Sequence, residues 1–597
     1  MQISKRCMSA FMLSWIMLSL NSAVILAGTP IGDIHRGPFV DKVEFRVIEN
    51  QMQQVEALLD GRIDIIGNNL ESVFGRELSA NDDIEAEQIF LGRLDYLVIN
   101  CQKYPYNITA FRKAVALAMD KRRVCEEAWE GFAIPHDSVI PYTNSWSIEN
   151  ETENSYYEGE QQEAAALLDG AGFLDIDDDG FREAPDGTEL KISIEREFSM
   201  QDTDPGDLIA QDLQEIGLDA HAYGPYYYPN PPWSLEYMDY DMAWLRQSES
   251  GVEPSWWANH LHSSRIGRTP GNWPRFNSTD IDALADTIVN SSNPDDVLSA
   301  CQEMQSILLE ECPVIPCYMP CKLQAYRDDR LAGITASRSE GIIGWWSSYK
   351  GHLTEAAGGP LGGTITWAIQ SGFETFNIME VTNKIEKLVL GHMYDSLFRL
   401  GPSGGMIPWL VDSFNVTTHQ DYASVPEGHL RFTLDILENA TWSDGEPITA
   451  DDVSFTLQQF MPQEMTTYWG DLSNLFSTFS LTSRRVAVEF NTTSYLHLTD
   501  FAFIPILPSH AFQDMNREEW SEWSPDPTSM VTSGPFNVSM VEEHNRIIME
   551  KRPDYFYWHG IETEGEGISI LPFHLAIAAS LVATGIVVME ILRRRMK

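Results

Sequence analysis

The chain has 597 residues, several times the size of a usual domain, so two or more lobes with their own cores are expected. Hydrophobic residues make up 43% and aromatic residues 11%, which excludes a disordered protein. The 88 acidic and 40 basic residues give a net charge of -48, and such a surface repels phosphate backbones, so nucleic acid is excluded as a partner.

The N-terminal segment has the layout of a secretory signal. Lys5 and Arg6 precede an apolar run that ends in small residues before Gly28. This pattern predicts a signal peptide over residues 1–28, and an uncleaved N-terminal anchor is the alternative.

From Val43 onward, short β-rich runs alternate with amphipathic helical stretches, which predicts an α/β architecture. The predicted strands are residues 43–48, 63–67, 94–100, 191–196 and 240–246. The predicted helices are residues 52–61, 110–129, 160–170 and 205–216.

A glycine-rich stretch divides the chain. Residues 349–363 lose periodicity, which marks a linker, and a new strand is predicted at 364–369. We therefore predict one lobe over residues 37–345, a linker over 346–363, and one or more lobes over 364–560.

The C-terminal end predicts a membrane anchor. Residues 568–589 form an apolar run of about twenty residues, long enough to span a bilayer. The basic sequence RRRMK follows and marks the cytoplasmic side. We expect a transmembrane helix over 568–592, a cytoplasmic tail over 593–597, and a single-pass protein whose bulk lies outside the cell. Such an anchor suits a prokaryote with a single surface membrane, such as an archaeon.

Two further features agree with export. Eight Asn-X-Ser/Thr sequons predict a glycosylated surface, at Asn107, Asn150, Asn277, Asn290, Asn415, Asn439, Asn491 and Asn537. Six cysteines follow the signal and favour disulfides: Cys101, Cys125, Cys301, Cys312, Cys317 and Cys321. The alternative, a metal site in ECPVIPCYMPC, lacks paired CxxC spacing.

The turn DIDDDG resembles a calcium loop, because carboxylates at alternate positions before a glycine suit a hard cation. The expected ligands of this alternative structural calcium site are Asp175, Asp177, Asp179, Glu183 and Asp186. No other cofactor is expected. His260 and His262 form a weaker candidate for a metal or a nickel chelate, since no third ligand is evident.

The part after the linker resembles the first half of the solute-binding proteins of peptide and nickel importers, known as solute-binding family 5. The resemblance rests on four segments: GGTITWAI, HMYDSLFRLGPSGGMIPWLVDSF, ATWSDGEPITADDVSFTLQQF and TSGPFNVSMVEEHNRIIMEKRPDYFYW. The third contains the family's "WSDGxPxTAxDV" signature from Trp442 to Val453 and is the most specific.

The part before the linker resembles the second half of the same family. It contains GPFVDKVEFRVIENQMQQVEALLDGRIDII, FRKAVALAMDKRRVCEEAWEGFAIP and AGFLDIDDDGFREAPDGTELKISI. The halves thus occur once each in swapped order, which indicates a circular permutation, with a fusion of two truncated paralogues as the alternative. We expect new termini after Trp558 and before Gly37, and a remaining hinge strand at 344–350.

The resemblance implies a two-lobed periplasmic-binding-protein-like fold (type II, cluster C-like) that closes over a ligand by hinge motion. It implies a binding protein and no enzyme: a membrane-anchored receptor of an ABC importer, whose permease and ATPase are separate chains. Short peptides are the expected ligand class.

In peptide-binding members an aspartate before "EP" holds the ligand's amino terminus. Here that position falls on Ser250, with Glu249 adjacent and Gln247 at the place of a usual tryptophan. Aromatic side chains that could stack on a ligand complete the expected site: Trp244, Trp256, Trp345 and Trp346. Packing in the core is the alternative for each.

Three other functions stay open. The same fold could bind a sugar or a nickel chelate, or serve an envelope sensor that lacks a transporter. A glycosidase needs two carboxylates at a defined separation, and no pair stands out from the other acidic residues.

Overall fold

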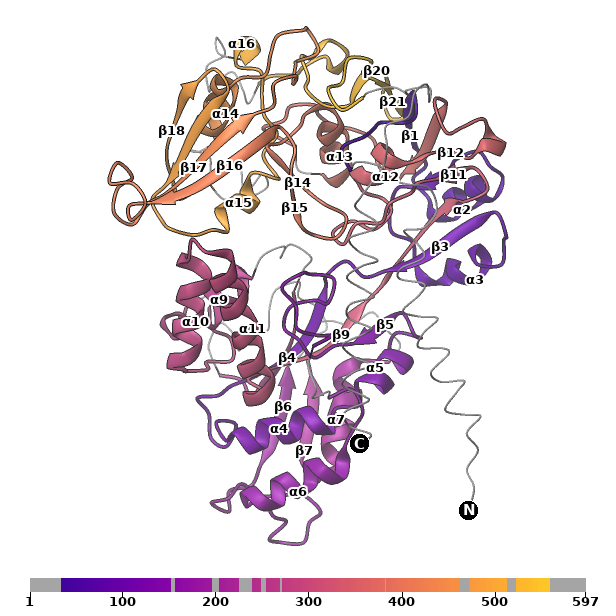
Figure 1. The fold of residues 1–597 in the computed structure, drawn as a ribbon. Helices are drawn as coiled ribbons and strands as arrows, with labels where there is room; N and C mark the ends of the chain where they lie inside the picture. The colour runs from indigo at the N-terminus through magenta and orange to yellow at the C-terminus, as the bar shows by residue number, and fades with distance from the viewer. Residues whose placement is uncertain are drawn as a thin grey trace, which may run out of the picture. The chain divides into compact units, whose positions relative to one another are not determined.

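Among the described residues, three large β-sheets organise the chain (Figure 1). The computed structural model describes residues 34–151, 156–195, 203–224, 239–247, 254–268, 271–381, 383–460, 472–512 and 522–558. All of these up to Phe556 belong to one unit. The predicted signal peptide, transmembrane helix and cytoplasmic tail lie outside the described ranges. Within those ranges, no helix combines the length and hydropathy needed to cross a membrane.

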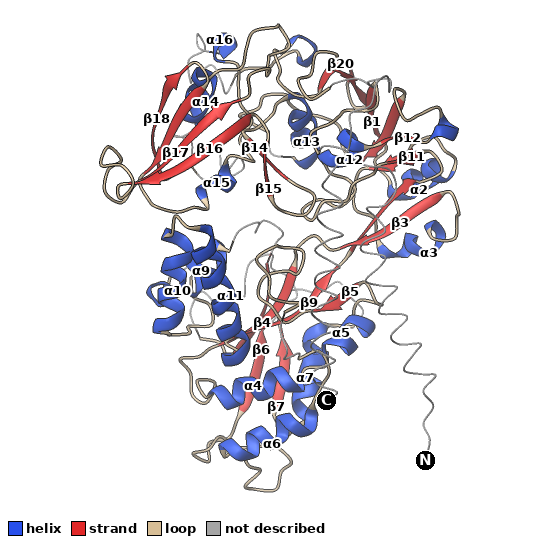
Figure 2. Ribbon diagram, in the orientation of Figure 1, coloured by secondary structure: helices blue, strands red, loops and turns tan. Residues whose placement is uncertain are grey.

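A six-stranded sheet forms the centre of one α/β layer structure (Figure 2). Its order is β5 (Ala133–Pro135), β9 (Val314–Pro320), β4 (Leu94–Ile99), β8 (Met242–Gln247), β6 (Lys191–Glu195) and β7 (Asp219–Tyr223). Strand β4 is buried along its whole length, and its side chains alternate between two cores. This alternation follows from the period of two in a strand that is covered on both faces.

Helices cover both faces of that sheet. One core is completed by α4 (Thr109–Ala118), α5 (Lys121–Glu127), α6 (Gln161–Ala171) and α7 (Pro205–Glu215). The opposite core is completed by α9 (Ser255–Leu261), α10 (Thr279–Asn290) and α11 (Pro294–Glu311). The helix predicted over 110–129 is divided in two, because Asp120 caps α5 by accepting a hydrogen bond from the Arg123 backbone N–H.

A seven-stranded sheet joins the two ends of the described chain. Its order is β20 (Phe536–Glu542), β21 (Arg546–Lys551), β1 (Lys42–Val47), β13 (Thr364–Ile369), β2 (Ile65–Ile66), β10 (Lys322–Arg327) and β3 (Ile84–Ile89). In Figure 1 the yellow end of the chain lies beside its indigo start. The Lys551 backbone N–H donates to the Asp41 carbonyl at 2.8 Å, and the Tyr555 and Tyr349 rings are 6.3 Å apart. Close chain ends of this kind are what a circular permutation requires.

The chain passes between the two sheets at two places, and neither is the predicted hinge. Residues 90–93 connect β3 to β4, and Cys321 alone connects β9 to β10. Residues 344–350 instead contain the buried helix α12 (Trp345–Lys350). The predicted hinge was wrong because the ends of the chain meet inside the seven-stranded sheet, so both crossings stay covalent. For the same reason residues 37–345 contribute to two sheets and do not form one lobe.

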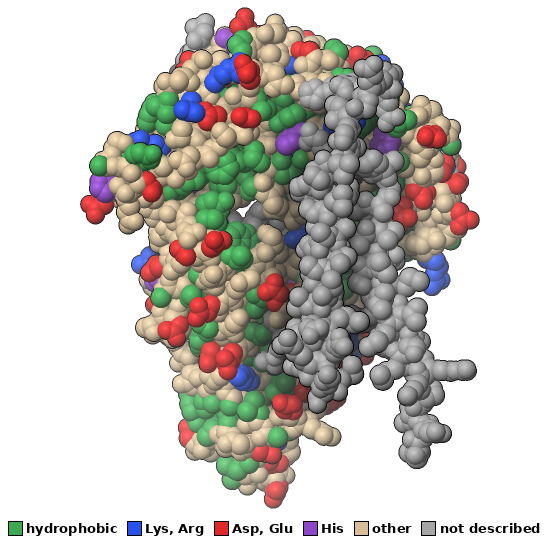
Figure 3. Space-filling view, viewed as in Figure 1, with side chains coloured by type: hydrophobic (Ala, Val, Ile, Leu, Met, Phe, Trp, Pro, Cys, Tyr) green, Lys and Arg blue, Asp and Glu red, His purple; other side chains and the backbone are tan. Residues whose placement is uncertain are grey.

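A four-stranded antiparallel sheet follows, in the order β16 (Val411–Thr418), β17 (Leu430–Ile436), β19 (Arg485–Phe490) and β18 (Leu475–Thr482). Figure 3 shows hydrophobic side chains gathered over this part of the visible face. The large exposed ones that the sheet and its loops carry are Phe414, Tyr422, Phe476, Phe479 and Leu481.

Shorter elements complete the fold. The small sheets pair β11 (Leu331–Ala332) with β12 (His352–Leu353) and β14 (Phe398–Leu400) with β15 (Met406–Pro408). The remaining α-helices are α2 (Gln51–Leu59), α3 (Gly75–Leu78), α13 (Lys384–Met393), α14 (Ala450–Phe460), α15 (His497–Asp500) and α16 (Ser509–Phe512). Because β12 and all of α12 except its first residue fall inside residues 346–363, the predicted linker is more ordered than its glycines indicate.

The predicted disulfides are absent from the described residues. All six cysteines after the signal are free thiols, and all but Cys101 are buried. Burial raises the pKa of Cys125 and Cys301 to about 12. They pack as small hydrophobic side chains on different elements, which explains why an even cysteine count misled the prediction.

Candidate functional site

A cavity of about 630 Å³ lies between the end of the six-stranded sheet and the small sheet of β14 and β15, beside α12 and α13. We call it the inter-sheet cavity. The six-stranded sheet contributes Arg93, just before β4, and Arg246 and Gln247 at the end of β8. The rest of the lining comes from Ser339, Glu340, Trp345, Trp346, Lys384, Lys387, Leu388, Gly391, Tyr394, Ser396, Arg399, Leu400, Ala502, Phe503 and Pro505. The lining comes from elements on both sides of the crossings at residues 90–93 and Cys321, an arrangement suited to capture by closure.

Helix α13 supplies one whole wall. Lys384, Lys387, Leu388 and Gly391 recur at intervals of three or four residues, so they share one helical face. Asn383 starts the helix, because its side chain accepts hydrogen bonds from the backbone N–H groups of residues 385 and 386. The helix therefore turns two cationic side chains toward the cavity.

An arginine held between aromatic rings forms the centre of the next wall. The guanidinium carbon of Arg399 is 3.6 Å from the ring centroid of Trp345 and 5.1 Å from that of Trp409. Its Nη2 donates to Asp395 Oδ1 at 2.8 Å. Stacking and pairing together fix the plane of the guanidinium.

Asp395 is completely buried and anchors this arrangement. Besides Arg399, it accepts hydrogen bonds from Trp409 Nε1 at 2.9 Å and from the Tyr555 hydroxyl at 3.1 Å. Burial raises the pKa of Asp395, and the Arg399 charge opposes that effect. Asp395 therefore links the lining residue Arg399 to Tyr555, which follows the last described strand, β21.

Several buried polar atoms of the lining have unused hydrogen-bonding capacity. Trp345 Nε1, Tyr394 Oη, Arg399 Nε and Gln247 Oε1 are buried and have no hydrogen-bond partner among the described residues. Buried polar groups are normally paired, so such a cluster indicates a place where a ligand completes the bonding. Burial also lowers the pKa of the neighbouring Lys387 to about 7, so its charge changes near neutral pH.

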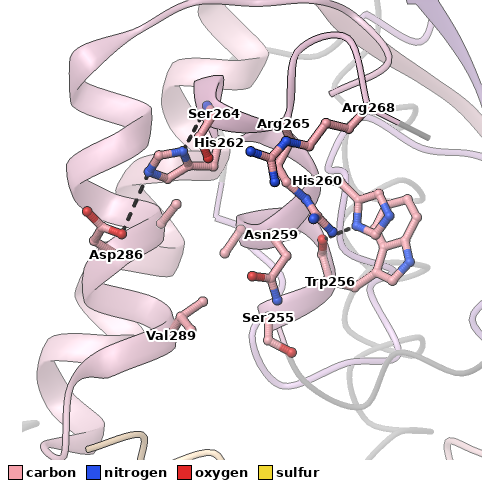
Figure 4. A pocket seen from close by; sticks show the side chains of 12 residues that line it. Ser255, Trp256, Asn259, His260, His262, Ser264, Arg265, Arg268, Asp286 and Val289 are labelled. Atoms are coloured by element: carbon pink, nitrogen blue, oxygen red, sulfur yellow. Dashed lines mark hydrogen bonds and ion pairs between the residues drawn. The ribbon is translucent and has the colours of Figure 1, made fainter. Parts of the chain in front are cut away.

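A second cavity, of about 780 Å³, lies within the helical layer on the six-stranded sheet (Figure 4). We call it the α9–α10 cavity. Here Trp256 stacks on His260 with ring centroids 4.0 Å apart, and His260 Nδ1 hydrogen-bonds to the Trp256 carbonyl. On the other side His262 Nε2 lies 3.7 Å from Asp286 Oδ1. The cavity is larger, but Trp256 and His260 are partnered with each other, and His262 is partnered with Asp286 and the Ser264 backbone N–H.

The predicted ligand residues are distributed over different places. Gln247, Trp345 and Trp346 line the inter-sheet cavity, as proposed from the sequence. Trp256 lines the α9–α10 cavity. Trp244 is packed in the core of the six-stranded sheet, with its ring 5.8 Å from Tyr318, which favours the alternative of core packing for this residue. Glu249 and Ser250 lie outside the described residues.

Sequence reasoning missed the residues that give the cavity its chemistry. Tyr394 and Arg399 lie in the segment HMYDSLFRL, which indicates the family resemblance but no ligand contact. Lys384 and Lys387 are spaced as one helical face in a strongly acidic chain. That spacing was the available signal for them.

The two histidines do not form a metal site with other described residues. The described side chains that converge as metal ligands are Asp175, Asp177 and Asp179, all exposed. Glu183 instead accepts a hydrogen bond from the Ile176 backbone N–H at 2.7 Å. Asp186 accepts one from the Thr188 backbone N–H. The acidic turn therefore gathers three of its five predicted ligands.

Seven of the eight predicted sequon asparagines are exposed, and Asn537 is half-buried. Asn439 Nδ2 donates to the Phe556 carbonyl at 3.2 Å, so the atom that would carry a glycan is engaged there. Asn290 Nδ2 likewise donates to the Asp286 carbonyl at 2.9 Å.

A family model described as bacterial extracellular solute-binding proteins, family 5, matches residues 35–267 and 405–590. The two matched blocks lie on either side of the glycine-rich stretch and together cover more than half of the chain.

Individual relatives match shorter parts. A putative binding protein of Brucella melitensis is 31% identical over 129 residues, 21% of this chain and 20% of the relative. Heme-binding protein A of Haemophilus influenzae is 24% identical over 236 residues, 37% of this chain and 38% of the relative. The chain thus spans well under half the length of these curated relatives. The solved structure of HbpA2 from Haemophilus parasuis is 17% identical, covers 51% of this chain and 56% of its own, and has a TM-score of 0.41, too low for a functional argument.

Proposed function

The chain belongs to the bacterial extracellular solute-binding proteins, family 5, and on this premise we propose that it captures an oligo- or dipeptide for an ABC importer. The peptide binds in the inter-sheet cavity, and the closed form delivers it to a permease. The permease and the ATPase are separate chains.

The observation that carries this proposal is the chemistry of the inter-sheet cavity. It combines a lining from the end of the six-stranded sheet and from α12, α13 and β14 with buried polar atoms that have no partner among the described residues. A bound solute supplies the missing partners and pulls the two sheets together, while residues 90–93 and Cys321 act as the crossings about which they move.

Mass spectrometry of small molecules released from the purified full-length chain tests the ligand class. Peptides in the released fraction support the proposal. Sugars or a nickel chelate overturn the peptide assignment and favour the alternative binders on the same fold. A genome neighbourhood without permease and ATPase genes favours an envelope sensor instead.

We also propose that the fold is circularly permuted. The supporting observations are the adjacency of β1 and β21 and the two separate blocks of the family match. A variant chain that joins residue 558 to residue 37 and opens at Gly358 would place the two halves in the unpermuted order. It should unfold with a free energy within about 1–2 kcal/mol of the natural order, because the same contacts form. Failure of this variant to fold, while variants opened in other exposed loops do fold, contradicts the permutation.

Anchoring by residues 568–592 and glycosylation at the exposed sequons remain proposals. Protease treatment of intact cells tests the anchor and the extracellular position of the rest of the chain. It should digest the extracellular part and leave a short C-terminal fragment in the membrane. A chain released by salt washing alone contradicts the anchor. Intact-mass measurement before and after deglycosylation tests the sequons.

Calcium binding at the acidic turn is a further proposal, supported by the convergence of Asp175, Asp177 and Asp179. At a calcium concentration about ten times a millimolar-range Kd, the free energy of unfolding should rise by about 1.4 kcal/mol. Urea denaturation measures this gain, and Asp177→Asn should remove it. An equal gain in wild type and variant excludes the turn.

A further inference from the structure

We propose that residues 493–496 form a latch between the parts of the chain on either side of the two crossings, and that this latch holds the inter-sheet cavity closed over a bound solute. We call the segment the latch loop. It leads out of the four-stranded sheet and contacts helix α10, which covers the six-stranded sheet. The proposal rests on the proposed solute-binding function and identifies residues that stabilise its closed form.

The base of the latch loop is fixed to the four-stranded sheet. The His497 ring, at the start of α15, stacks on Phe490 of β19 with ring centroids 4.0 Å apart and ring planes 7° from parallel. His497 Nε2 and the Thr492 hydroxyl are hydrogen-bonded at 2.7 Å. Phe501, directly after α15, is fully buried and packs against Phe432 of β17. These contacts hold the loop in one position relative to the sheet.

The latch loop bonds to the C-terminal end of α10. The Tyr495 backbone N–H donates to the Ser291 carbonyl at 2.8 Å. The Thr493 hydroxyl donates to the Asn290 carbonyl, 203 residues away in the sequence. The last carbonyl groups of a helix have no partner within the helix and are satisfied from outside it. Here the partner comes from beyond both crossings.

A buried leucine adds to these bonds. Leu496 is 6% exposed and belongs to the core that α9, α10 and α11 complete on the six-stranded sheet. Every other described buried residue of that core lies between Leu94 and Met319. Leu496 therefore enters a core that the earlier part of the chain builds, and its apolar surface leaves water when the latch closes.

The segment that carries the latch also lines the inter-sheet cavity. After α15 it contributes Ala502, Phe503 and Pro505 to the lining, and the Phe503 side chain is 37% exposed. A turn connects this part to α15, since the Phe503 backbone N–H donates to the Asp500 carbonyl at 3.1 Å. A solute that contacts Phe503 therefore favours the closed latch, and by linkage the closed latch raises the affinity for that solute.

The contacts of the latch loop are fewer than those within either sheet. The loop makes the two hydrogen bonds and the leucine contact named above, whereas β17 is bonded to a strand on each side along its length. A contact of this size can open while both cores stay folded. The crossings at residues 90–93 and Cys321 keep the chain connected when it does.

Hydrogen exchange of the purified full-length chain, followed by mass spectrometry, tests the latch. The backbone amide of Tyr495 should exchange faster than the amides of β17, because opening of the latch exposes it without unfolding. The tripeptide Ala-Phe-Ala is the probe solute. At about ten times its Kd it should slow exchange at Tyr495 about tenfold, because it binds the closed form.

Thr493→Val keeps the shape of the side chain and removes its hydrogen bond to α10. It should speed exchange at Tyr495 about fivefold, as for the loss of one hydrogen bond. The matched control is Thr528→Val, because the Thr528 hydroxyl donates to Asp526 within an exposed turn. This control should leave exchange at Tyr495 unchanged.

Leu496→Ala removes most of a buried side chain and should speed exchange at Tyr495 at least about thirtyfold. Its control is Leu190→Ala, because Leu190 is also 6% exposed but lies in the core on the opposite face of the six-stranded sheet. Both variants should lose stability, and only Leu496→Ala should speed exchange at the latch.

The outcomes separate the latch from the proposed function. Exchange at Tyr495 as slow as in β17 means that the contact is a permanent part of the fold, which overturns the latch. Unchanged exchange in Thr493→Val and Leu496→Ala also overturns it, as does binding of Ala-Phe-Ala without slower exchange. If Ala-Phe-Ala does not bind, that result counts against the peptide assignment, and the exchange rates of the wild type and the variants still decide the latch.

Discussion

The two cavities differ in how many buried polar atoms of their lining lack a hydrogen-bond partner among the described residues. The α9–α10 cavity is the larger, about 780 Å³ against about 630 Å³, yet Trp256 and His260 stack on each other there. Among the described residues, Arg265 Nε is the one buried lining atom of that cavity without a hydrogen-bond partner. In the inter-sheet cavity, Gln247, Trp345, Tyr394 and Arg399 each have one. Unused bonding capacity, and not volume, is therefore what distinguishes the inter-sheet cavity as the candidate site, because burying a polar group without a partner is costly.

The largest expected difference between the cavities concerns stability. Arg399→Ala removes the cation that pairs with the fully buried Asp395, and breaking a buried pair from one side costs about 3–5 kcal/mol. Arg268→Ala, at an exposed position of the α9–α10 cavity, should cost no more than about 0.5 kcal/mol. Urea denaturation of both variants measures the contrast. Similar losses in the two variants would remove the distinction between the cavities.

A second difference should appear in acid. Burial lowers the pKa of His392, on α13 behind the inter-sheet cavity, to about 4. As pH falls below about 6.5 the unfolded chain binds a proton there, and the folded chain does not until about pH 4. This histidine should therefore remove about 3 kcal/mol of stability between those two pH values.

The variant His392→Gln isolates that contribution. Its unfolding free energy, followed in urea from pH 7 to pH 4.5, should fall less steeply than that of the wild type. Other groups titrate equally in both chains and cancel in the difference. Parallel curves would mean that His392 takes up its proton equally in the folded and unfolded states.

The smallest effect on stability should accompany a clear effect on binding. Tyr394→Phe removes a buried hydroxyl that has no partner among the described residues, so the unfolding free energy should change by no more than about 0.5 kcal/mol. Affinity for the released ligand should fall several-fold. Tyr240→Phe is the control, because its hydroxyl donates to the Trp273 carbonyl and its loss should cost about 1 kcal/mol without changing affinity. A large stability loss in Tyr394→Phe would indicate a structural role for that hydroxyl.

Periodicity and motifs predicted the local structure well. The strand at 364–369 appears at that position as β13, and the helix predicted over 205–216 appears as α7. The family signature near Trp442 identified the family, which the match over two blocks confirms. These features depend on neighbouring residues, so a single sequence contains them.

Which residues line the inter-sheet cavity depends on contacts between segments that are far apart in the sequence. Gln247 and Trp346 were chosen from the sequence, but their neighbours Arg93, Tyr394 and Arg399 come from segments far away along the chain. Trp244 looks as suitable as Trp346 in the sequence, and only the packing of β8 buries it in a core. Aromatic residue type is the same in both cases, so composition cannot separate them.

The sequence by itself determined the α/β class, the order of the elements and the family, because each follows from local periodicity or from a contiguous motif. The tertiary structure alone decided that the six cysteines stay apart and that the crossings lie at residues 90–93 and 321. It also decided that Lys387 and Arg399 face one cavity. These properties depend on which distant strands pair, and long-range pairing is set by the whole core and not by neighbouring residues.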